Sequence, residues 1–192
     1  MSLLGLDTSG DGGMYIRWMA SANAWKAGGE EVTLKYFVLD YHSVKTGWGW
    51  LQEGLAPGWS WDEKVGVKSK RPGDTEEEQQ EWKRGFSVML FEKELGVREW
   101  ATTATGAIMG FDLLYSAVAT EAPNHEGLLP VIEYTKSEPL KVGKGNTRVP
   151  EFVVVKWVEK PADFQEVDIE IVNEPSDTTL VEATISEDKI PF

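Results

Sequence analysis

The sequence predicts a mainly β domain with one α-helix, followed by a disordered acidic tail at the C-terminus. Three observations indicate this fold class. Short segments alternate apolar and polar residues, one window has apolar residues at helical spacing, and the chain beyond Pro161 has no periodic apolar face. With 192 residues, 41% of them hydrophobic, the chain suits one domain of ordinary size. We therefore divide it into a domain over residues 1–163 and a tail over residues 164–192.

The predicted strands are short runs rich in β-branched and aromatic residues. They span residues 14–19, 31–40, 85–92, 96–103, 128–135 and 152–159. The third and fourth of these alternate cleanly and form a β-hairpin. The window 106–120 predicts an amphipathic helix, with an apolar face made by Ile108, Phe111, Tyr115 and Val118. The predicted order is therefore strands, helix, strands.

The connections are predicted from glycine, proline and charge content. Residues 1–13 form an extended arm, and residues 26–29 separate the first two strands. Residues 42–84 form a long functional loop, because they hold many glycines and prolines and five of the nine tryptophans. Residues 141–146 form a Gly- and Lys-rich loop between the last two strands.

Charge is distributed unevenly along the chain. The net charge is −13, and residues 161–192 account for −8 of it, so the preceding residues carry only −5. A mildly acidic body can still present a local basic stripe to an anion. The charge therefore does not exclude a nucleic-acid partner.

Composition and motifs argue against several other classes. The chain has no cysteine and two histidines, which excludes thiolate and His-rich metal sites. It has no apolar run of about 20 residues and no secretory leader, so we expect a soluble protein with no membrane partner. It has no phosphate loop, dinucleotide fingerprint, nucleophile elbow or zinc-protease motif. The acidic run at 76–81 is typical of a solvated helix face. We therefore predict no catalytic residue, metal or cofactor, and no enzyme activity.

The tryptophans indicate a binding function. Trp48 and Trp50 are two residues apart, as are Trp59 and Trp61, so each pair lies on one side of an extended chain. Two neighbouring indoles make a platform on which a base or a sugar ring stacks. The same residues suit a second interpretation, in which they pack the long loop onto the body.

Basic residues near the tryptophans favour a nucleic-acid ligand over a neutral sugar. Lys64, Lys68, Lys70, Arg71, Lys83 and Arg84 lie in or beside the aromatic-rich loop. In the hairpin, Arg98 and Trp100 share a strand face, which suits one phosphate and one stacked base. The paired strand offers either the face with Phe91 or the face with Phe86, and one of these must belong to the core.

The last six residues carry the most specific signal. Glu187-Asp188-Lys189-Ile190-Pro191-Phe192 resembles the C-terminal tip of bacterial and phage single-stranded-DNA-binding proteins, which ends in acids followed by Ile-Pro-Phe. The resemblance implies docking of this tip to replication and recombination proteins. Its partner-binding residues would be Glu187, Asp188, Ile190, Pro191 and Phe192. Lys189 departs from the family's unbroken acidic run.

The body is similar to a divergent group of tailed-phage single-stranded-DNA-binding proteins, through residues 44–49 (VKTGWG) and 84–88 (RGFSV). This resemblance implies an OB-fold, a five-stranded Greek-key barrel, here with long loop insertions. It also implies a protein that coats single-stranded DNA with low sequence specificity during phage DNA replication, recombination and repair. The protein would work in the cytoplasm of a bacterial host. The resemblance is compatible with a monomer and with a homo-oligomer.

Stacking and phosphate contacts together define the predicted DNA-binding residues. They are Lys45, Trp48, Trp50, Trp59, Trp61, Lys68, Lys70, Arg71, Arg84, Phe91, Arg98 and Trp100. The alternative function is a Trp-rich carbohydrate-binding or phage structural β-module, which explains the tryptophans but not the Ile-Pro-Phe end. A third class, a metal-dependent nuclease, lacks acids at ligand spacing.

Overall fold

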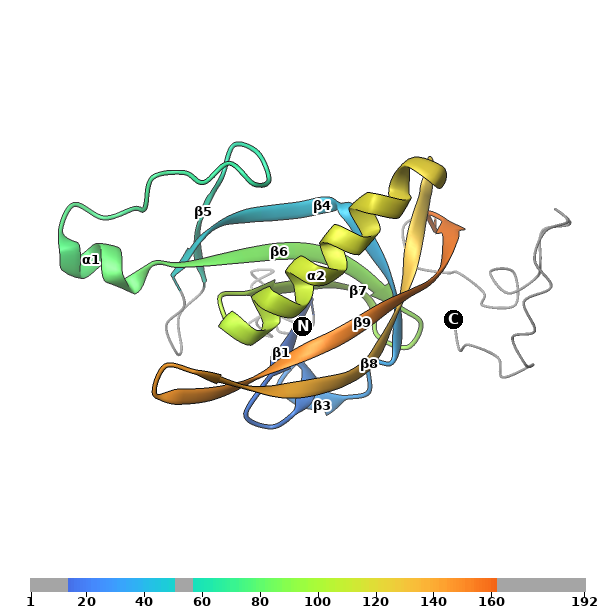
Figure 1. Cartoon of the computed structure of the whole chain (residues 1–192), viewed down its shortest axis with the longest axis horizontal. Coiled ribbons are helices and arrows are strands. Elements are labelled where there is room, and N and C mark those ends of the chain that lie inside the picture. The colour runs from blue at the N-terminus through green and yellow to red at the C-terminus, as the bar shows by residue number, and fades with distance from the viewer. Residues whose placement is uncertain (1–13, 51–56, 162–192) are drawn as a thin grey trace, which may run out of the picture.

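The computed structural model describes residues 14–50 and 57–161, which form a mainly β fold with one long helix, as predicted (Figure 1). The strands are β1 Tyr15–Met19, β2 Ala24–Ala27, β3 Glu30–Val32, β4 Tyr36–Trp50, β5 Gly58–Trp61, β6 Lys83–Glu92, β7 Gly96–Thr102, β8 Leu128–Val142 and β9 Gly145–Glu159. The helices are α1 Glu76–Glu81 and α2 Thr105–Glu121, with a 3₁₀ turn at Ala122–Asn124.

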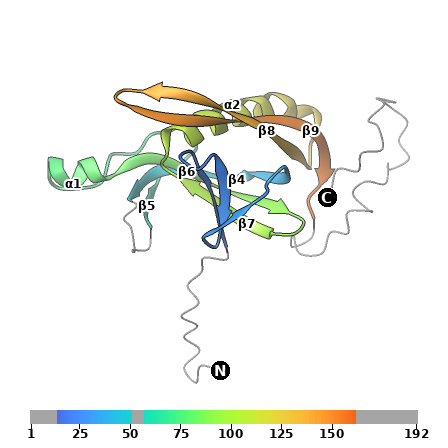
Figure 2. The same cartoon turned by 90° about the horizontal axis from the view of Figure 1, so that it is seen from below.

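One sheet contains all of these strands. Their order is β3-β2-β1-β7-β6-β4-β8-β9, and β5 attaches to β4. Neighbours are antiparallel except β1 and β7, which are parallel. The sheet curls into a half-barrel. Figure 2 shows the β8–β9 hairpin on one side of the core and β6 and β7 on the other.

Strand β4 links the parts of the sheet. It pairs with β6 along most of its length, with β8 near its start and with β5 near its end. Its register with β6 shifts between Asp40 and Lys45, which marks a β-bulge. A bulge bends its strand and increases the local twist. Beyond it, β4 and β6 extend away from the core toward β5 and α1 (Figure 1).

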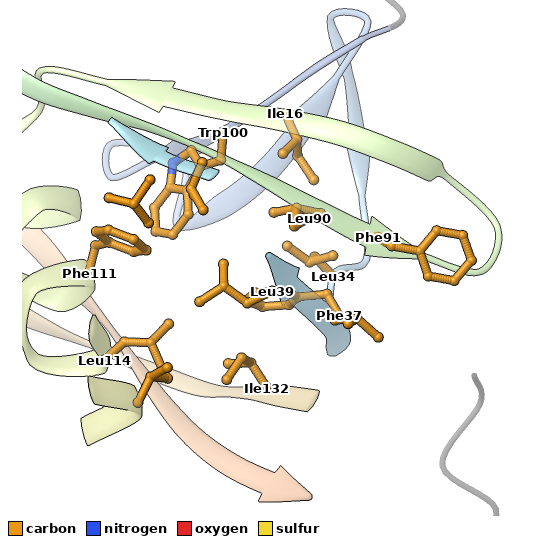
Figure 3. Close-up of a cluster of buried hydrophobic side chains, with 14 of the residues drawn as sticks. Ile16, Leu34, Phe37, Leu39, Leu90, Phe91, Trp100, Phe111, Leu114 and Ile132 are labelled. Carbon is orange, nitrogen blue, oxygen red and sulfur yellow. The ribbon is translucent and has the colours of Figure 1, made fainter. Parts of the chain in front are cut away.

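Helix α2 fills the open side of the curled sheet. It buries Phe111, Leu114 and Val118, and Figure 3 shows Phe111 and Leu114 pointing into the core from the helix. Two of its glycines allow a close approach to β9. A Cβ atom at Gly106 or Gly110 would lie 2.3 Å from a carbonyl oxygen of that strand. The glycine spacing therefore sets how near the helix lies to β9.

Side chains join the two ends of the half-barrel. Trp18 and Trp25 of the β1–β2 hairpin contact the ring of Tyr134 on β8, with centroid distances of 5.6 and 6.0 Å. The Trp18 indole N–H donates to the carbonyl of Arg148 at 3.3 Å, and the Arg148 Nε donates to Asn23 Oδ1 at 3.0 Å. An aromatic cluster with polar contacts at its rim thus connects β1 and β2 to β8 and β9.

The predicted hairpin at 85–103 and the helix at 106–120 are confirmed within two residues. Several other predictions were wrong in extent. The sequence predicts that residues 26–29 separate two strands, but β2 reaches Ala27. The single strand predicted at 31–40 is interrupted, and its second part begins at Tyr36 as β4. Strand β4 then continues to Trp50, within the loop predicted at 42–84. The loop at 141–146 is a tight turn at residues 143–144, with Gly143 at φ +57°.

The predicted arm at 1–13 and the predicted tail at 164–192, with its tip, lie outside the described residues. Within the described ranges, no helix combines the length and apolarity that crossing a bilayer would require.

Candidate nucleic-acid interface

The predicted aromatic and basic residues gather on the part of the sheet that extends from the core. We call it the β4–β5–β6 ribbon, made of residues 45–50, 58–61 and 83–87. Its two faces differ. In the strand register, Gly47 and Gly49 share a face with Trp61 and Trp59, and Trp48 lies on the opposite face.

Trp59 and Trp61 form a parallel pair of indoles on the first face. Their ring centroids are 4.5 Å apart and their planes differ by 6°. Both side chains are partly exposed. The sequence predicted that this pair lies on one side of its strand, and the register confirms it. We call the pair the Trp platform.

Glycines create the floor under the Trp platform. A Cβ at Gly49 would lie 2.8 Å from the Trp59 ring, and a Cβ at Gly85 would lie 2.9 Å from it. A Cβ at Gly47 would lie 3.0 Å from the Trp61 ring. Any side chain at these positions would displace an indole. The glycines therefore explain how two large rings fit against the sheet.

Two lysines border the Trp platform on the same face. Lys45 Nζ lies 5.9 Å from the centre of the Trp61 ring. Lys83 pairs with Gly49, which pairs in turn with Trp59, so Lys83 also projects from this face. Both lysines are exposed. The face thus offers aromatic surface between two cations, of which Lys45 belongs to the predicted set.

Trp48, on the opposite face, is not available for stacking. Its side chain is only 3% exposed. Lys68, Arg71 and Arg84 lie over its ring at 4.5 to 5.2 Å, and its indole N–H donates to the Ser69 carbonyl at 3.0 Å. The prediction that Trp48 stacks on a base is therefore wrong, because the loop after β5 folds over it.

Asp62 holds this loop in place. Its side chain is fully buried and accepts hydrogen bonds from both terminal nitrogens of Arg84, at 2.8 and 2.5 Å. It also accepts from the Thr46 hydroxyl at 2.6 Å, and from the Ser69 amide and hydroxyl at 2.9 and 2.8 Å. The Arg84 guanidinium, with these other donors, holds the pKa of the Asp62 carboxyl well below its usual range despite burial. Arg84 is thus committed to Asp62 rather than free for a phosphate.

The remaining loop cations are exposed. Lys68, Lys70 and Arg71, all in the predicted set, project from the segment that follows Asp62. Lys68 and Arg71 lie over the Trp48 ring, whereas Lys45 lies with the Trp platform. The structure therefore divides the predicted cations between the two faces of the ribbon.

Three predicted residues on the hairpin belong to the core or border it. Trp100 is 0% exposed and Phe91 is 4% exposed, so neither can stack on a base as predicted. Arg98 pairs with Leu90 and lies on the same face as Trp100, half-buried, with Nη1 donating to the Val97 carbonyl at 2.8 Å. Since α2 covers this face, the Arg98–Trp100 pair points inward. Figure 3 shows Trp100 within the cluster and Phe91 at its margin.

A cavity of about 460 Å³ adjoins the Trp platform where the ribbon meets α1. Its lining comes from both sides: Trp50, Lys83 and Thr103 near the strands, and Glu77, Gln80 and Glu81 on α1. Gly49 also lines it. The Trp50 indole N–H donates to Glu81 Oε2 at 2.8 Å. Trp50, predicted to stack, therefore forms a wall of this cavity.

Sequence reasoning missed several of these residues. The glycine floor, Asp62, Thr103 and the cavity side of α1 were not among the predicted site residues. The alternating glycines at 47 and 49 were a usable signal, since glycine within a strand often marks a close approach of another group.

The described residues contain no group of three or more side chains suited to hold a metal ion. The comparisons with known proteins identify no relative. No family model matches the chain, and neither a curated protein nor a solved structure matches it. The geometry of the ribbon therefore carries the functional argument by itself.

Proposed function

We propose that this protein binds single-stranded DNA with low sequence specificity through the Trp platform. The observation that carries the proposal is the parallel, partly exposed pair of Trp59 and Trp61, set on a glycine floor and bordered by Lys45 and Lys83. Stacking on an indole suits all four bases, because every base has a π-face. The lysines would neutralise phosphates and release counterions.

The proposal extends to the biological role implied by the resemblance. The acidic tip at 187–192 would recruit replication and recombination proteins while the domain coats a phage's single-stranded DNA in a bacterial cytoplasm. The half-barrel is compatible with an OB-fold, and we propose it as an elaborated member of that architecture. The proposal includes no cofactor and no catalytic step.

Intrinsic tryptophan fluorescence on titration with poly(dT) tests the proposal. We expect partial quenching, because Trp59 and Trp61 are partly exposed while Trp18, Trp25 and Trp100 stay buried. Raising the salt from about 50 to about 200 mM should reverse it, since phosphate contacts weaken steeply with salt.

A neutral oligosaccharide serves as the control. Quenching by the oligosaccharide and none by poly(dT) at low salt would favour the carbohydrate-binding alternative and overturn the proposal.

A further inference from the structure

The cavity beside the Trp platform has features that a general binder of single strands does not need. We infer that it is a selective pocket for one unpaired guanine base in the bound strand. This inference rests on the proposed function, because the base would reach the pocket only as part of a strand held on the platform.

Gly49 lies between the pocket and the platform. Gly49 and Thr103 line the cavity, and the Trp59 ring lies next to Gly49. A Cβ at Gly49 would lie 2.7 Å from Thr103 Cγ2 and 2.8 Å from Trp59 Cζ3. A strand that stacks a base on the platform would therefore bring a neighbouring base to the mouth of the cavity. Its volume of about 460 Å³ is within the usual range for small-molecule sites, about 300–1,000 Å³.

Hydrogen bonds within residues 73–79 cap α1, which forms one wall of the cavity. Thr75 caps the helix by accepting from the Glu78 amide at 3.2 Å, and Glu78 accepts from the Asp74 amide at 2.8 Å. Gln79 Nε2 donates to the Gly73 carbonyl at 2.9 Å. These contacts use residues outside the cavity lining. Of the side chains that line the cavity, Glu81 accepts from the Trp50 indole N–H, and those of Glu77, Gln80 and Lys83 stay available for a ligand.

The chemistry of the lining favours a base edge over a phosphate. Glu77 and Glu81 are one helical turn apart on α1 and both line the cavity. Among the described residues, no hydrogen bond or ion pair engages the side chains of Glu77, Gln80 or Lys83. Ionised carboxylates only accept hydrogen bonds, so they select groups that donate them and repel phosphates. Lys83 would meet the phosphate next to the base.

Guanine matches these acceptors best. Its Watson–Crick edge presents the N1–H and the 2-amino group side by side, and one carboxylate accepts from both. Each of the other bases places an acceptor next to its donor, which a carboxylate repels. Trp50, whose N–H is already engaged by Glu81, supplies an aromatic wall for the bound ring.

The test compares oligo(dT) with the same strand carrying one central dG, one central deoxyinosine or one central dC. Fluorescence anisotropy of end-labelled strands gives each dissociation constant. We expect the dG strand to bind about tenfold more tightly than oligo(dT), in the range of a bidentate contact to a base. Deoxyinosine lacks the 2-amino group and should bind like dT. The dC strand should gain less affinity over oligo(dT) than the dG strand does.

Variants of α1 assign the effect to the pocket. Since one carboxylate accepts from both guanine donors and an amide cannot, at least one of Glu77→Gln and Glu81→Gln should reduce the dG advantage toward unity. Glu76→Gln is the matched control, since it removes the same charge from the same helix outside the cavity lining. The readout is the ratio of dG to dT affinity, so a general gain in affinity from the lost charge cancels.

The outcomes separate the two proposals. Binding of oligo(dT) with no gain for dG would overturn the guanine pocket and leave the proposed function standing. A dG advantage that persists in Glu77→Gln and Glu81→Gln would also overturn it. If no strand binds at low salt, the proposed function itself fails.

Discussion

Asp62 is the residue whose removal should disturb the ribbon most. Its carboxylate accepts five hydrogen bonds, three at Oδ1 and two at Oδ2, and two of the five come from the Arg84 guanidinium. Asp62→Asn keeps the size of the side chain. It turns one oxygen into an amino group, which cannot accept from Arg84 Nη2 or from Thr46.

The structure sets the expected loss. A hydrogen bond that involves a charged group contributes about 1.5–3 kcal/mol, and an ordinary one contributes about 0.5–1.5 kcal/mol. The Arg84 side chain is 30% exposed, so water partly replaces the hydrogen bonds that it loses. The loss of stability therefore stays below that of breaking a fully buried ion pair. We expect Asp62→Asn to lower the free energy of unfolding by about 2–4 kcal/mol. In a chain of this size, a loss of about 3 kcal/mol lowers the melting temperature by about 6–12 °C.

The pH dependence gives a second signature. The folded-state pKa of Asp62 is depressed, so its contribution to stability is complete above the unfolded pKa of about 4 and declines as the pH falls. The parent should lose this contribution at about 1.4 kcal/mol per pH unit below that point, and Asp62→Asn should not. The stability gap between the two proteins should therefore be about 1 kcal/mol narrower at pH 3 than at pH 6.

Urea unfolding followed by circular dichroism at both pH values measures these quantities. Glu63→Gln, an exposed neighbour, is the control and should change stability by less than about 0.5 kcal/mol. A loss below about 1 kcal/mol for Asp62→Asn, or a gap that does not change with pH, would refute the role assigned to Asp62.

Two further predictions concern residues that the structure reassigns. Trp100→Ala should destabilise the fold by about 3–5 kcal/mol in urea unfolding, because the ring is fully buried, and a change of less than 1 kcal/mol would contradict that placement. Gly85→Ala places a Cβ 2.3 Å from the Thr102 carbonyl oxygen and 2.9 Å from the Trp59 ring. It should cost about 1–3 kcal/mol of stability and weaken oligo(dT) binding, and unchanged binding by a folded variant would show that the glycine floor does not matter.

The sequence predicts the elements whose periodicity is unambiguous. The hairpin at 85–103 alternates over both strands, and the helix at 106–120 repeats apolar residues at helical spacing. Alternation separates two faces but does not say which of them is covered. The placement of α2 decides that the face with Arg98 and Trp100 is the inner one. Neither residue could have been placed without that tertiary contact.

The candidate site was only partly predictable for a similar reason. The spacing of Trp59 and Trp61 fixes their common face, and the structure confirms it. Trp48 belongs to a pair with the same spacing, but its ring is covered by a loop that Asp62 anchors from 14 residues further along. Such long-range pairing of a loop with a strand leaves no local pattern. The sequence does not reveal the extent of β4 either, because Gly47 and Gly49 are residues typical of loops.

The most direct test of the account is the affinity for oligo(dT) of the double variant Trp59→Ala/Trp61→Ala, measured by anisotropy at low salt. The control is Trp157→Ala, a partly buried tryptophan near the C-terminal end of β9 whose ring stacks on His125 at 4.6 Å. That end of β9 lies at the other end of the molecule from β5 (Figure 1). Base stacking on an aromatic side chain contributes about 1–3 kcal/mol per base. The account therefore predicts that the double variant binds at least tenfold more weakly, roughly the lower limit of that range. The control should bind with nearly the affinity of the parent. A folded double variant that binds oligo(dT) as tightly as the parent would contradict it.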